Sequence, residues 1–117
     1  MSELQTVETA NLPTATPARA ALPLVLIADA NPVSRRRRVR ELEDRGYRVA
    51  AARTSFETIV KASCYLPDLI LVGASLGAEH AHETTELLST CPATAHIPIL
   101  HVAAGRRLPA RLDVSPR

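Results

Sequence analysis

The chain has 117 residues, 46% of them hydrophobic, which suits one domain with a real core and leaves no room for a second. Aromatic residues make up 3% of the sequence and tryptophan is absent, so any core must be aliphatic. This composition favours an α/β fold over an aromatic-rich β-barrel. The formal net charge of +2 is too small to indicate a polyanion partner.

Several site classes are disfavoured by the sequence. No apolar run resembles a signal peptide or a membrane span, and we expect a cytoplasmic protein. Cys64 and Cys91 form no Cys-x-x-Cys motif and are interpreted as reduced, buried thiols. His80 and His82 point to different sides of a helix, and His80 with Glu83 is a common exposed pair, so no metal is expected. Without a Gly-rich phosphate loop or an activated nucleophile, we expect no cofactor and no enzymatic activity.

The first third of the chain predicts a leader, a strand and a helix. Residues 1–22 are rich in Thr, Ala, Pro and Glu without any period, which is typical of a disordered leader. Leu24–Ala28 is a continuous apolar run, as in a strand covered on both faces. Asn31 is a favourable N-cap and is followed by proline, so a helix is predicted over residues 32–45, with Gly46 as its stop.

This first helix has a thin apolar stripe of Val33, Val39 and Leu42, in which Arg36 stands where a leucine is expected, so its packing should be poor. Four arginines follow one another in it. We interpret them as a solvated face whose stems cover apolar surface, with docking to a protein as the alternative. Nucleic acid is disfavoured because no aromatic residue is interleaved for stacking. The four are Arg35, Arg36, Arg37 and Arg38.

The middle of the chain predicts a second strand and a second helix. Tyr47–Ala51 alternates weakly and is interpreted as a short strand. Thr54 and Glu57 have the spacing of a capping box, so a helix should begin there and end before Pro67. Its predicted apolar face consists of Phe56, Ile59, Val60 and Cys64.

Two further strands flank a third helix. Leu69–Gly73 lacks polar alternation and predicts a central buried strand, residues 78–91 predict a helix, and Ile97–Ala103 predicts the last strand. The alternation of strands and helices with short loops predicts a parallel sheet with right-handed crossovers over residues 23–105. Residues 106–117 are expected to form a basic tail, without a fifth strand or a last helix.

In this order, three segments resemble the response-regulator receiver domain, the CheY-like family of two-component signalling. LVLIADANPVSRRRRVRELEDRGYRVAAA resembles its first strand, acidic turn, first helix and second strand. PDLILVGASLG resembles its third strand and phosphoacceptor loop, and PATAHIPILHVAAG resembles the approach to its fourth strand and switch position. The resemblance implies a flavodoxin-like parallel sheet with helices on both faces, here lacking the fifth strand and last helix of the order 2-1-3-4-5.

The resemblance also locates a degenerate site. The family's acidic, metal-holding pair corresponds to Asp29 and Ala30, its phosphoacceptor aspartate to Gly73, and its switch hydroxyl to Ala103. The family's lysine has no counterpart. Ser75 offers one neutral oxygen, and a single carboxylate beside it makes no convincing Mg²⁺ site. We therefore expect a C-terminally truncated pseudo-receiver that neither takes up a phosphoryl group nor binds a metal.

Two functions follow as hypotheses. The first is a non-phosphorylatable interaction module in a two-component phosphorelay, which docks to a histidine kinase, a phosphotransfer protein or another response regulator, or dimerises. Its surfaces would be the first helix and the edge of the fourth strand, with Ile99 and His101. That edge could instead be covered by residues 108–114 folding back. The alternative function is a small basic dimeric accessory protein that binds an acidic or nucleic-acid surface.

Overall fold

The computed structural model describes residues 22–112 and contains one four-stranded sheet. All neighbouring strands are parallel and their order is β3-β2-β4-β5. The strands are β2 (Leu24–Ala28), β3 (Arg48–Ala52), β4 (Leu69–Gly73) and β5 (Ile99–Val102). The predicted α/β parallel fold is confirmed. Residues 1–21 of the predicted leader lie outside the described residues, as do residues 113–117 of the tail.

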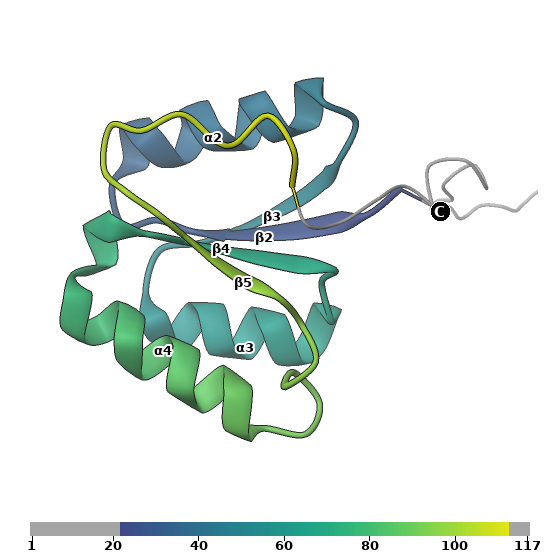
Figure 1. Cartoon of the computed structure of the whole chain (residues 1–117), viewed down its shortest axis with the longest axis vertical. Helices are drawn as coiled ribbons and strands as arrows, with labels where there is room; N and C mark the ends of the chain where they lie inside the picture. Colours follow the sequence, from purple (N-terminus) through teal and green to yellow (C-terminus); the bar gives the residue numbers. More distant parts are fainter. Residues whose placement is uncertain (1–21, 113–117) are drawn as a thin grey trace, which may run out of the picture.

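Helices cover both faces of this sheet (Figure 1). Helix α2 (Pro32–Asp44) lies on one face, and α3 (Ser55–Tyr65) and α4 (Ala78–Thr90) lie on the other. A 3₁₀ turn, η1 (Ala74–Leu76), connects β4 to α4. The predicted caps are confirmed: the side chain of Asn31 accepts hydrogen bonds from two backbone N–H groups of α2, and Thr54 accepts one from the N–H of Glu57.

Alternation along the strands divides the core into two layers. One layer joins Val25, Ile27, Leu69 and Leu71 of the sheet to Leu42 of α2. The other packs against α3 and α4 and contains Leu26, Ala28, Ile70, Val72, Ala62 and Leu88. All five residues of β4 are buried, as the unbroken apolar run predicts for a central parallel strand.

The helix faces differ from the prediction. In α2, Val33 is 62% exposed, while Arg38 and Leu42 are the buried residues. Arg38 therefore does not belong to the solvated arginine face, because it packs against the end of the sheet.

In α3, the predicted apolar face was wrong at three of its four positions: Phe56 is 77% exposed, and Val60 and Cys64 are exposed as well, whereas Ile59 packs against the core. Thr58 and Ala62 face the core instead. Their small side chains let the helix approach the sheet, and Thr58 satisfies its hydroxyl by donating to the carbonyl of Thr54 (2.7 Å). The prediction of buried thiols was wrong for Cys64, which is exposed.

After β5 the chain returns along α2 (Figure 1). Leu108 is 5% exposed and packs into the layer that contains Leu42 and Val102, with Leu112 half-buried against it. Arg45 at the end of α2 donates hydrogen bonds to the carbonyls of Pro109 (2.5 Å) and Leu108 (3.4 Å). This segment therefore covers a sheet face beside α2.

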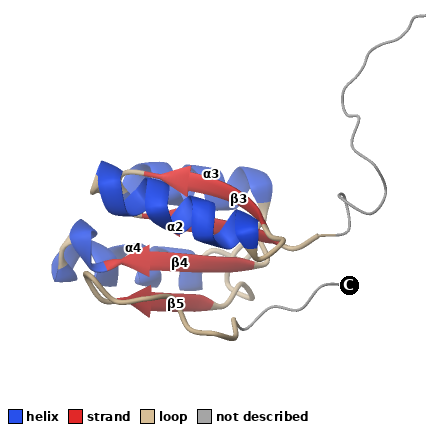
Figure 2. Ribbon diagram, turned by 90° about the horizontal axis from the view of Figure 1, so that it is seen from above, coloured by secondary structure: helices blue, strands red, loops and turns tan. Residues whose placement is uncertain are grey.

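In the described part of the chain, β5 is an edge strand that pairs only with β4, and no fifth strand lies beyond it (Figure 2). Ile99 and Leu100 are half-buried and His101 is exposed. The returning segment forms no ladder with this edge. Across residues 22–112, no helix combines the length and the apolar character needed to span a bilayer.

Candidate functional site

The candidate site lies where three parallel strands end. Asp29 follows β2, Gly73 ends β4, and Ala103 follows β5, so all three meet at the carboxyl edge of the sheet. This is the edge at which open α/β sheets hold ligands. A cavity of about 250 Å³ opens there, between the start of α2, the loop after β4 and the loop after β5. Its lining includes Asp29, Asn31, Ser34, Arg37, Arg38, Gly73, Ser75 and Gly105.

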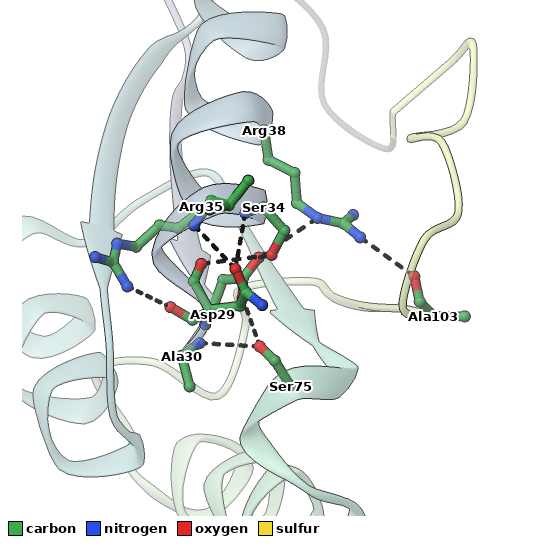
Figure 3. Close-up of polar contacts among 9 residues, drawn as sticks. Asp29, Ala30, Ser34, Arg35, Arg38, Ser75 and Ala103 are labelled. Atoms are coloured by element: carbon green, nitrogen blue, oxygen red, sulfur yellow. Dashed lines mark hydrogen bonds and ion pairs between the residues drawn. The ribbon is translucent and has the colours of Figure 1, made fainter.

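The Asp29 carboxylate is buried, with 1% of the residue exposed, and the chain's own donors surround it (Figure 3). Its Oδ1 accepts from the backbone N–H of Asn31 (2.9 Å) and from the hydroxyl of Ser75 (2.5 Å). Its Oδ2 accepts from the hydroxyl of Ser34 (2.5 Å). The guanidinium of Arg38 forms an ion pair with the same Oδ2, with Nε at 3.6 Å. Both carboxylate oxygens are therefore occupied.

These contacts set the ionisation of Asp29. Burial raises the pKa of its carboxyl, but the hydrogen bonds from Ser34, Ser75 and Asn31 and the positive charge of Arg38 together lower that pKa below its ordinary value. The carboxylate is therefore charged at neutral pH, and its charge is balanced within the fold.

Arg38 links two loops of the site. It is 3% exposed, and its Nη2 donates to the carbonyl of Ala103 at 3.2 Å. Figure 3 shows its guanidinium between Asp29 and Ala103. Arg38 thus joins the end of β2 to the end of β5. Its Nε and Nη1 have no hydrogen-bond partner among the described residues.

The turn after β2 is fixed by two further contacts. The backbone N–H of Ala30 donates to the hydroxyl of Ser75 (2.9 Å), and Nη1 of Arg35 donates to the carbonyl of Asp29 (3.0 Å). Ser75 therefore contacts both residues that correspond to the acidic pair. It holds the loop after β4 against the turn after β2.

Gly73 lies against the same carboxylate. A Cβ at this position would lie 3.1 Å from the carbonyl oxygen of Ala28 and 3.5 Å from Cγ of Asp29. The first distance is tighter than an ordinary carbon contact, so even alanine requires a small shift of the backbone. Any longer side chain at position 73 would begin beside Asp29, although glycine itself contributes no reactive group.

The site does not fit the divalent cation that the family implies. Hard cations need several oxygen ligands, usually with more than one carboxylate. Here Ala30 contributes no carboxylate and both oxygens of Asp29 are already hydrogen-bonded or ion-paired. No group of three His, Cys, Asp or Glu side chains suited to a metal occurs among residues 22–112.

The predicted residues of the vestigial receiver site lie together, but two side chains that hold Asp29 were not predicted in that role. The turn after β2 and the loop after β4 contact each other through Asp29, Ala30, Gly73 and Ser75. Ala103 is connected to them through its carbonyl, which accepts a hydrogen bond from Arg38. Ser34 was not predicted, and Arg38 was predicted as part of the arginine face of the first helix, not as a partner of Asp29. Their spacing of four residues places both on one face of α2. Position 34 is also one turn from the N-cap, within reach of the preceding loop.

Known structures share this fold. No family model matches the sequence, and no curated protein matches it. Among solved structures, the N-terminal domain of a response regulator receiver protein from Methanoculleus marisnigri JR1 is 32% identical, with a TM-score of 0.67 over 75% of this chain and 72% of that chain. The chain belongs to the response regulator receiver family.

Other receiver domains share the fold at lower identity. The chemotaxis response regulator CheY4 of Vibrio cholerae is 24% identical, with a TM-score of 0.63 over 68% of this chain and 67% of that chain. A receiver protein from Pseudomonas putida is 24% identical, with a TM-score of 0.62 over 71% and 69%. The receiver fold implies a place in two-component signalling, and receiver domains are generally non-catalytic modules that interact with kinases, phosphotransfer proteins or other regulators.

The lowered pKa of Asp29 in this receiver domain predicts a pH-dependent stability. Asp29→Asn leaves Arg38 buried without its counter-charge and should lower the free energy of unfolding at pH 7 by about 3 kcal/mol. Because the folded-state pKa lies below the unfolded value, the wild-type advantage is present above about pH 4 and is lost as the pH falls through the folded-state pKa.

Urea unfolding of both proteins from neutral to acidic pH measures this difference. Asp44→Asn, on the exposed end of α2, is the matched control and should change stability by less than about 0.5 kcal/mol. A difference between wild type and Asp29→Asn that stays constant down to the lowest pH would contradict the assignment.

Proposed function

We propose that this chain is a non-phosphorylatable receiver domain that acts in two-component signalling through protein contacts. The proposal is supported by one observation: Asp29 is saturated by donors from the chain itself, and the neighbouring Gly73, which the resemblance aligns with the phosphoacceptor, has no side chain. The domain keeps the receiver architecture without groups able to take up a phosphoryl group.

Phosphoryl transfer requires an oxygen nucleophile and positive charge that neutralises the transferred group. Gly73 offers no nucleophile. The hydroxyl of Ser75 is the nearest oxygen on the same loop, but it donates to Asp29 and accepts from the N–H of Ala30. Asp29 itself is held by an arginine in place of a metal ion.

Arg38 also determines how the loop after β5 is held. By linking Asp29 to the carbonyl of Ala103, it holds the loop after β5 without any added ligand. A loop fixed in this way presents one surface to partners at all times. We therefore propose that docking by this domain does not depend on phosphorylation.

Incubation with acetyl phosphate and Mg²⁺ tests the chemistry, because it offers the domain a small phosphodonor without a kinase. Intact-mass measurement should show no species heavier by about 80 Da, the mass of one phosphoryl group. A receiver domain with an intact phosphoacceptor aspartate serves as the positive control. A stable phosphorylated form of this chain would overturn the proposal.

The edge of β5 is a second candidate contact surface. The N–H of Ile70 donates to the carbonyl of Pro98 (3.0 Å), and Ile70 is in register with Ile99. In a parallel ladder this turns the backbone groups of Ile99 and His101 away from β4. We propose that they pair with a strand of a partner or of a second copy.

His101→Pro tests strand pairing because proline removes the outward N–H of position 101 without removing a bond to β4. His101→Thr, which keeps the N–H, is the matched control. Light scattering should show an assembled wild type and His101→Thr but a smaller His101→Pro, with both variants folded by circular dichroism.

Affinity capture with the same three proteins extends the test to other partners. A histidine kinase, phosphotransfer protein or response regulator should be retained by wild type and His101→Thr and reduced with His101→Pro. If wild type is monomeric and all three proteins retain the same partners, β5 is not the contact surface.

A further inference from the structure

A basic groove lies between α2 and the returning C-terminal segment. Its volume is about 560 Å³, and five arginines and two carboxylates line it. We propose that this groove binds an acidic segment of a partner protein, an inference that rests on the proposed docking function and names its chemistry. The lining residues are Arg37, Arg38, Arg40, Glu41, Asp44, Gly105, Arg106 and Arg107.

The walls of the groove are held at both ends. At one end, Arg38 donates to the carbonyl of Ala103 (3.2 Å), and at the other, Arg45 donates to the carbonyls of Leu108 (3.4 Å) and Pro109 (2.5 Å). The buried side chain of Leu108 anchors the segment to the core. The two basic residues between these contacts, at positions 106 and 107, are therefore held opposite α2.

Arg38 is ion-paired with Asp29, but the other four arginines of the groove are not neutralised by ion pairs within the described chain. Among residues 22–112, no ion pair joins the exposed Arg37, Arg40, Arg106 or Arg107 to a carboxylate. Glu41 is already paired at 2.9 Å with Arg45, which is not one of the groove arginines. The groove thus carries an excess of guanidinium groups, whose planar donors suit carboxylate oxygens.

Arg38, which lines the groove, keeps unused hydrogen-bonding capacity. Its side chain is 4% exposed, yet Nε and Nη1 have no hydrogen-bond partner among the described residues. Nε faces Asp29 in the ion pair at 3.6 Å, so Nη1 is the nitrogen left without any partner within residues 22–112, and an unsatisfied buried donor is costly. Arg38 lines both this groove and the cavity beside Asp29, so an occupant of the groove also contacts the residue that holds the β5 loop.

The mixed lining favours an acidic protein segment over nucleic acid. Glu41 and Asp44 would repel a continuous row of phosphates, whereas a protein segment can place isolated carboxylates opposite the arginines. No aromatic side chain lines the groove for base stacking. The chemistry of the groove therefore indicates spaced aspartate or glutamate side chains.

Fluorescence anisotropy with a labelled peptide of alternating glutamate and glycine tests the proposal. Wild type should bind this peptide and not the matched glutamine–glycine peptide. The double variant Arg40→Gln/Arg106→Gln removes one guanidinium from each wall and should bind about tenfold more weakly. The control Arg53→Gln/Arg111→Gln removes the same charge from exposed positions outside the groove and should stay within about twofold of wild type.

Three results would overturn the groove assignment: no binding of the glutamate peptide by wild type, equal losses in both double variants, or stronger binding of a single-stranded oligothymidylate. Circular dichroism of both variants confirms that a loss does not reflect unfolding. The phosphodonor result is independent of these readouts. Phosphorylation of the wild type would contradict the proposed function without affecting the result for the groove. Absence of peptide binding would contradict the groove assignment without affecting the result with the phosphodonor.

Discussion

The contact between Asp29 and Arg38 is the constraint on which the rest of this structure depends. A buried carboxylate needs compensation, and in this fold the compensation comes from one guanidinium, two serine hydroxyls and one backbone N–H. The backbone donor lies in the turn after β2, one hydroxyl lies in the loop after β4, and the other hydroxyl and the guanidinium lie on the first turns of α2. Satisfying one charge therefore fixes the relative positions of β2, α2 and the loop after β4.

The same arginine extends this constraint to the far edge of the sheet. Through the carbonyl of Ala103, Arg38 holds the start of the segment that returns along α2, and Arg45 holds its end. Leu108 then completes the apolar layer beneath. The buried charge, the loop after β5 and the basic groove are thus parts of one continuous arrangement, which supports a docking surface that needs no phosphoryl group.

Much of the fold was predictable because its signals are local. Unbroken apolar runs identified β2 and β4, and the caps at Asn31 and Thr54 located two helix starts within a residue. The resemblance to receiver domains located Asp29 and Gly73 at the ends of adjacent strands. These signals depend on hydrogen bonds and burial within a few residues, which the sequence displays directly.

The helix faces and the key partner of Asp29 were not predictable in the same way. Hydrophobicity favoured Val33 and Phe56 as core residues, but both are exposed. In α3, Thr58 and Ala62 face the core in place of Phe56. Arg38 is buried where Asp29, nine positions earlier, and the carbonyl of Ala103 meet it in space. A sequence pattern predicts that an arginine is exposed, and only the tertiary structure shows that this one is buried with a charged partner.

The central claim is that the chain itself saturates the receiver site, so that no divalent cation enters it. Titration of the ¹⁵N-labelled protein with millimolar Mg²⁺ tests this claim directly, because backbone amide signals report each loop separately. Because the site is already saturated, the signals of Ala30, Gly73 and Ser75 should not move. Saturable shifts confined to those residues would contradict it.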